Sequence, residues 1–160
     1  MLGIEQEASV GWKEYSESDF LTEIPSDWEG CYIYGAMLYV EYAISKEEMS
    51  CGSDYDSDSM LEAIFISISS GRTIGGSEGA SFASAQEEAE EGVEEKRTIM
   101  VSGREATLYL YEDDSARVLV ESDPYLGHVN FYTISTYDYD DQDIRGAFDH
   151  VIETFEIQEN

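Results

Sequence analysis

The sequence predicts an α+β protein: one antiparallel β-sheet covered by helices, arranged as an α/β/α sandwich. Three observations lead to this fold class. The chain has 160 residues, 42% of them hydrophobic, which suffices for one domain with a buried core. Short segments of alternating polar and apolar residues, typical of half-buried strands, recur along much of its length. Two further segments show the period of an amphipathic helix, one in mid-chain and one at the C-terminus.

The first half of the chain predicts mainly strands. Residues 20–24 form a short β-like segment, and Pro25 ends it because proline has no N–H to donate to a ladder. Residues 31–44 are rich in β-branched and aromatic side chains, which favours one long strand or two short ones. Residues 45–59 are expected to form a loop. Residues 61–69 alternate, so their isoleucines and the residues between them point to opposite faces.

A helix is expected at residues 82–95, where apolar residues recur every three or four positions. Ser84 and Glu87 have the spacing of a capping box. Residues 71–79 contain four glycines and predict a flexible connection. Further strands are predicted at residues 98–101, 106–111, 117–121 and 128–135.

The C-terminal helix has the clearest pattern. Acidic residues within 140–143 precede it, where the helix dipole favours negative charge. Apolar residues then form one wide stripe: Ile144, Ala147, Phe148, Val151, Ile152 and Phe155. We expect the stripe to pack on a sheet face that contains Leu108, Leu110, Val118, Val120 and either Phe131 or its neighbour Val129.

We divide the chain into a flexible acidic N-terminal segment, residues 1–17, and a single α+β domain, residues 18–160. The first residues lack a basic region followed by an apolar one, so the sequence shows no signal peptide. No apolar run is long enough to span a membrane as a helix.

Net charge excludes several classes of partner. The chain has 36 acidic and 8 basic side chains, a formal net charge of -28. Nucleic acids and anionic membrane surfaces require the opposite sign. Protein partners with basic patches, cationic ligands and divalent cations are compatible with it. The alternative is that the charge serves solubility alone.

Two environments explain such acidity: the cytoplasm of an extreme halophile, where salt screens the repulsion, and the outside of a bacterial cell. The abundance of Ile, Tyr and Glu favours an extracellular or cell-surface location, with the cytoplasm as the alternative. Cys31 and Cys51 are the only cysteines, and their spacing is poor for zinc. We expect a disulfide between them if the protein is secreted and free thiols if it is cytosolic.

The candidate metal ligands are Asp54, Asp56 and Asp58, which alternate as the first ligands of a calcium loop do. The turn glycine and bidentate glutamate of a tight site are missing, because Ser59 and Phe65 hold those positions. Divalent cations are therefore expected to bind weakly, with a Kd of about 10⁻⁴–10⁻³ M. A solvated acidic loop is the alternative. A second acidic cluster at residues 138–143 is explained by helix capping.

Catalytic patterns find little support. The sequence has no Gly-x-Ser-x-Gly elbow, and residues 71–79 lack the lysine of a phosphate loop. His128 and His150 could each assist a serine, and Cys31 would form a thiol–imidazole pair with His128 only if the fold brings them together. We expect no catalytic residue and no cofactor. The twelve tyrosines suit sheet packing or, alternatively, an exposed binding face of tyrosines and acids.

The order of several motifs resembles the PsbP-like family. A strand runs into Ile-Pro-Ser-Asp-Trp at residues 24–28, and an acidic mid-chain helix precedes a strand–glycine–strand element at residues 101–111. An acidic hairpin turn and a final helix running into residues 152–157 complete the pattern. The family includes extrinsic photosystem II proteins, a Ran-binding nuclear import factor and bacterial surface lipoproteins. The resemblance covers residues 20–157 and implies an α/β/α sandwich that binds or assembles without an agreed catalytic site.

The resulting hypothesis is a non-enzymatic binding or assembly module of a secreted or surface-attached bacterial protein, monomeric or dimeric. An acidic cytosolic adaptor of a halophilic organism is the alternative, and an uncharacterised hydrolase is a less favoured one.

Overall fold

The computed structural model describes residues 11–36, 39–45, 63–70, 73–74, 77–78, 81–122 and 130–158. The strands are β1 (Trp12–Glu17), β2 (Phe20–Pro25), β3 (Glu29–Ala36), β4 (Tyr39–Ser45), β5 (Ala63–Ser70), β6 (Thr73–Ile74), β7 (Ser77–Glu78), β8 (Val93–Val101), β9 (Arg104–Tyr111), β10 (Ala116–Glu121), β11 (Asn130–Thr136) and β12 (Glu156–Ile157). The helices are α1 (Phe82–Ala89) and α2 (Gln142–Thr154).

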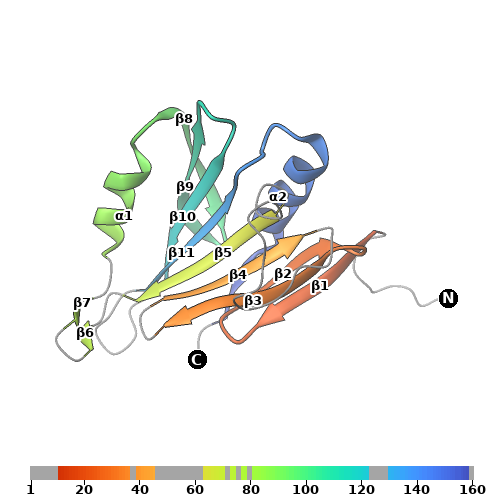
Figure 1. The fold of residues 1–160 in the computed structure, drawn as a ribbon, viewed down its shortest axis with the longest axis horizontal. Helices are drawn as coiled ribbons and strands as arrows, with labels where there is room; N and C mark the ends of the chain where they lie inside the picture. Colours follow the sequence, from red (N-terminus) through yellow and green to blue (C-terminus); the bar gives the residue numbers. More distant parts are fainter. Residues whose placement is uncertain are drawn as a thin grey trace.

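The main sheet has seven strands in the order β3-β4-β5-β11-β10-β9-β8, and each neighbouring pair is antiparallel. Helix α2 packs on one face of this sheet and α1 on the other (Figure 1). A smaller sheet, β1-β2-β12, lies against α2 through β2. The predicted fold class, an antiparallel sheet with helices on both faces, is therefore confirmed.

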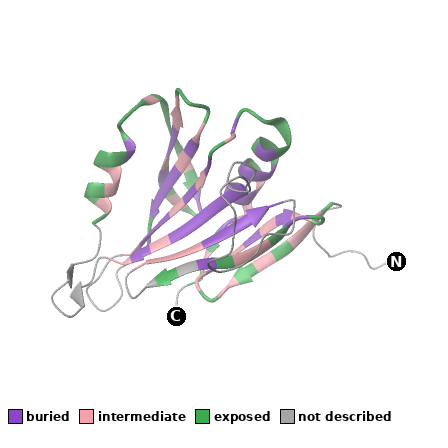
Figure 2. Ribbon diagram, viewed as in Figure 1, coloured by how far each residue is buried: buried purple, intermediate pink, exposed green. Residues whose placement is uncertain are grey.

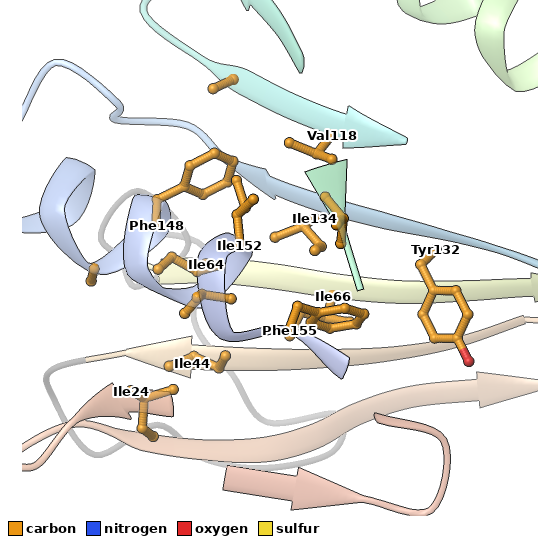
Figure 3. Close-up of a cluster of buried hydrophobic side chains, with 14 of the residues drawn as sticks. Ile24, Ile44, Ile64, Ile66, Val118, Tyr132, Ile134, Phe148, Ile152 and Phe155 are labelled. Carbon is orange, nitrogen blue, oxygen red and sulfur yellow. The ribbon is translucent and has the colours of Figure 1, made fainter. Parts of the chain in front are cut away.

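The main core lies between α2 and the sheet (Figure 3). Phe148 of α2 is 0% exposed, and Val118 and Ile134 face it from the central strands. The isoleucines of β5 point to this side, as their alternation predicts. Burial is concentrated on the central strands and on the inner side of α2 (Figure 2). The predicted docking of the apolar stripe is confirmed.

Of the two alternatives predicted for this packing, Phe131 or Val129, Phe131 does not join the core, so that alternative is wrong. Val120 faces α2, and its cross-strand partner is Tyr132. Because cross-strand partners share a face, Tyr132 enters the core and Phe131 points to the opposite face. There its ring lies 5.7 Å from that of Phe82 in α1, between centroids. Val129 lies outside the described residues.

Helix α1 is shorter than predicted, because it ends at Ala89 and residues 93–95 begin β8. Glutamates at a helix C-terminus oppose the helix dipole. Gly92, at a φ of +76°, then turns the chain into the strand.

The N-cap of α1 is Ser81, whose hydroxyl accepts a hydrogen bond from the Ser84 backbone N–H at 3.0 Å. The capping box predicted at Ser84 is therefore wrong.

The flexible N-terminal segment was predicted too long, because residues 12–17 form β1 and pair with β2. The ring of Tyr15 anchors the strand, lying 5.8 Å from the ring of Phe20 between centroids. A Cβ atom at Gly30 would lie 2.6 Å from Tyr15 Cζ, so glycine permits this close approach. The glycine-rich connection at residues 71–79 likewise contains a short hairpin, β6–β7.

Candidate functional site

An open groove of about 380 Å³ lies between the β1–β2 sheet and the first half of α2. Both tryptophans of the chain line it, Trp12 from β1 and Trp28 from the turn after β2. The full lining consists of Trp12, Pro25, Asp27, Trp28, Gln142, Asp143, Gly146 and Ala147. The groove thus combines two indole rings with two carboxylates.

The sheet wall of the groove is fixed by local hydrogen bonds. Pro25 stands opposite Trp12 in the β1–β2 register. The Ser26 N–H donates to the Gly11 carbonyl at 2.7 Å, and the Trp28 N–H donates to the Pro25 carbonyl at 2.9 Å. The second bond closes the turn that carries Asp27. Trp28 is 5% exposed, so one of the two indoles is anchored in the core.

The helix wall begins at the α2 N-cap, Asp141. Its carboxylate accepts hydrogen bonds from the backbone N–H groups of Asp143 and Ile144, at 2.9 and 3.1 Å. One turn later Gly146 faces open space, since a Cβ atom built there meets nothing within 4 Å. Glycine in a helix interior costs about 0.5–1 kcal/mol relative to alanine. Gly146 therefore leaves room in the groove at a cost in helix stability.

Trp12 is held from behind by His150 of α2. The indole and imidazole rings are stacked, with centroids 3.7 Å apart and an interplanar angle of 19°. The His150 Nε2 atom lies 2.8 Å from Glu23 Oε1 on β2. The Thr154 hydroxyl donates to the His150 carbonyl at 2.8 Å and accepts from the Glu23 N–H at 2.9 Å. These contacts fix the histidine and the glutamate relative to each other.

The chemistry of the groove favours a cationic guest. Asp27 and Asp143 are exposed, and the described residues that line the groove include no basic side chain. An indole face attracts a cation within about 6 Å of its centroid. The His150 ring contacts Trp12 and the carboxylate of Glu23.

Two other grooves contain basic residues that are already engaged. Beside α1, Lys96 forms an ion pair with Glu90 at 2.7 Å. Beside the β9–β10 turn, the Arg145 guanidinium stacks on the Tyr139 ring, 4.6 Å from its centroid, and Arg97 pairs with a glutamate of its own strand. Exposed pairs of this kind contribute little stability. The two ion pairs place a carboxylate beside Lys96 and beside Arg97.

Several predicted site residues lie outside the described residues: Asp54, Asp56, Asp58, Cys51 and His128. Among the residues that the structure does describe, no cluster of three His, Cys, Asp or Glu could hold a metal ion. Asp141 has the capping role predicted for the acidic cluster before α2. Cys31 is disulfide-bonded.

Most of the tyrosines whose burial the structure describes are packed within the fold. Tyr42, Tyr109, Tyr132 and Tyr139 are buried, whereas Tyr32 and Tyr137 are about half exposed. Next to Tyr39, burial raises the pKa of Glu41, and a hydrogen bond from the Tyr39 hydroxyl opposes this effect.

Sequence reasoning missed the groove because its walls are far apart in the chain. The feature of the sequence that could have indicated the groove is Gly146, a glycine in the middle of an amphipathic helix.

No family model and no curated protein matches the chain. Comparison with solved structures finds 13 chains that match this one. One of them is the solution structure of cyanobacterial PsbP (CyanoP) from Synechocystis sp. PCC 6803, at 13% identity and a TM-score of 0.45. The match covers 99% of both chains and concerns the arrangement of elements alone. Within the described residues, neither helix is long and apolar enough to cross a membrane.

Proposed function

We propose that this chain is a non-enzymatic binding domain that captures a basic segment of a partner protein. A lysine or arginine side chain of that segment enters the groove between Trp12 and Trp28, and Asp27 and Asp143 bind its charge. The observation that carries the proposal is the convergence of both tryptophans with two exposed carboxylates around an open Gly146.

Charge complementarity supports a basic protein partner. A net charge of -28 attracts basic surfaces and accelerates their encounter. The partial positive charge at the α2 N-terminus opposes a cation, but the N-cap Asp141 and Asp143 in the first turn offset it. The indole walls favour an organic cation over a bare metal ion, whose ligands are oxygens.

An extracellular or cell-surface location is part of this proposal. The disulfide at Cys31 supports it, because disulfides persist in oxidising compartments. The acidic adaptor of a halophilic cytoplasm remains the alternative and predicts loss of structure in low salt. Weak binding of calcium at Asp54, Asp56 and Asp58 is a separate proposal. It predicts a rise in Tm with calcium over a salt-matched sodium control, and an equal rise in both would contradict it.

Two charge-neutral variants test the groove. Calorimetric titration with a hexapeptide of alternating glycine and arginine, in about 150 mM sodium chloride, should show saturable binding to the wild type. Gly146→Leu fills the groove and should weaken binding about tenfold or more, equivalent to about 1.4 kcal/mol. Gly146→Ala adds only a methyl group and should bind as the wild type does. Equal binding by all three proteins would show that the acidic surface as a whole, and not the groove, attracts the peptide.

A second pair of variants tests the carboxylates. Asp27→Asn with Asp143→Asn removes two charges from the groove. Glu87→Gln with Glu88→Gln removes two exposed charges from α1. The first pair should weaken peptide binding by more than the second. Equal losses would contradict a specific role of Asp27 and Asp143.

A further inference from the structure

We infer that His150 is a positioning residue that makes the groove sensitive to pH: neutral His150 backs Trp12 as a wall for a cation, and protonated His150 weakens the capture of that cation. The inference rests on the function proposed above and adds its regulation. It is carried by the stacking of Trp12 on His150 and by the contact of His150 with Glu23.

The geometry couples the histidine to the groove through one ring. Trp12 lines the groove and also stacks on His150 with 3.7 Å between centroids. A proton on His150 places a cation against the indole from behind, and the ring then attracts a second cation less. The two positive charges also repel each other directly. Glu23, 2.8 Å from Nε2, accepts the hydrogen bond of the charged ring.

The charges around His150 are mostly acidic. On β2 the nearest is Glu23, and its cross-strand neighbour on β1 is Glu14. Lys13, the residue after Trp12, forms an ion pair with Glu29 at 3.2 Å. On α2 the neighbours are Asp149 before it and Glu153 three residues after it, and Asp27 and Asp143 line the groove itself. His150 is therefore placed to bring a positive charge directly to the back of Trp12.

Linkage makes the coupling reciprocal. If protonation of His150 weakens cation binding by a given factor, a bound cation weakens protonation by the same factor. Histidine side chains change charge between about pH 5 and 8. Because the wild type and His150→Gln carry the same carboxylates in the groove, comparing the two proteins isolates the effect of His150.

The test uses the full chain, the arginine–glycine hexapeptide and the variant His150→Gln, whose side chain stays polar but takes up no proton. Wild-type Kd should rise about threefold or more between about pH 8 and about pH 5.5. The Kd of His150→Gln should stay constant, and His128 is present in both proteins. A wild-type Kd that does not change, or an equal change in both proteins, overturns the inference.

Tryptophan fluorescence gives a readout that needs no peptide. A protonated imidazole stacked on an indole quenches its emission, so wild-type fluorescence should fall on acidification. The fall should vanish in His150→Gln and in Trp12→Phe, which retains Trp28. A pH-independent wild-type emission overturns the inference even if the peptide binds. Absence of peptide binding at about pH 8, with normal quenching, overturns the proposed function instead.

Discussion

Replacing Phe148 with alanine should lower the free energy of unfolding by about 3–5 kcal/mol. The side chain is 0% exposed, and its ring lies 5.5 Å from that of Tyr139, between centroids. Loss of buried apolar surface accounts for about 2–3 kcal/mol. Loss of the aromatic contact adds about 0.5–1.5 kcal/mol, and the cavity left behind adds the remainder.

Urea unfolding followed by circular dichroism measures this loss. The urea concentration at the midpoint of unfolding should fall, while the m value, the dependence of the free energy of unfolding on urea concentration, should stay the same. Phe82→Ala is the matched control, because Phe82 of α1 is only half-buried on the opposite face of the sheet. It should cost clearly less than Phe148→Ala. A loss below about 1 kcal/mol for Phe148→Ala would refute the docking of α2 on the sheet.

Three further predictions concern single residues. Gly146→Ala should stabilise the protein by about 0.5–1 kcal/mol, because its Cβ meets open space in a helix interior; a destabilised variant would mean that the site is not open. Glu41→Gln should raise Tm at pH 7, with a gain that shrinks on acidification. Burial raises the pKa of Glu41, so the folded state holds the proton more tightly and stability is lost as pH rises through the folded pKa; a lower Tm at pH 7 would contradict this. Thiol titration of unfolded, unreduced protein should detect no free thiol at Cys31 or Cys51, and two free thiols would count against the disulfide and the extracellular location.

The sequence predicted well those elements whose pattern is strong and local. The apolar stripe of α2 is buried only if that side of the helix packs on the sheet. In β5, apolar and other residues alternate, which assigns each side chain to one face of the sheet. The sequence did not predict elements whose residues are polar but which tertiary contacts hold in place. Strand β1 is rich in polar residues, yet Tyr15 over Gly30 and Trp12 over His150 hold it in place. The end of α1 differs from the prediction because Val93 continues the helical spacing of apolar residues, although it follows the turn at Gly92 and belongs to β8.

The candidate site was predicted less well than the fold. The net charge of the sequence is enough to predict a cationic partner, but it does not predict which residues bind that partner. His150 was regarded as a candidate only if a nucleophile lay nearby, whereas it stacks on Trp12 and contacts Glu23. These residues come from β1, β2 and α2, and no spacing in the sequence brings them together.

The central claim, capture of a cationic side chain between the two indoles, is tested most directly by nuclear magnetic resonance of the ¹⁵N-labelled protein. The indole N–H resonances of Trp12 and Trp28 and the amide of Gly146 should shift together and saturate as the arginine–glycine hexapeptide is added. The same titration of Gly146→Leu should leave both indoles unmoved. Shifts spread over the exposed glutamates of α1, with the two indole resonances unchanged in the wild type, would contradict the account.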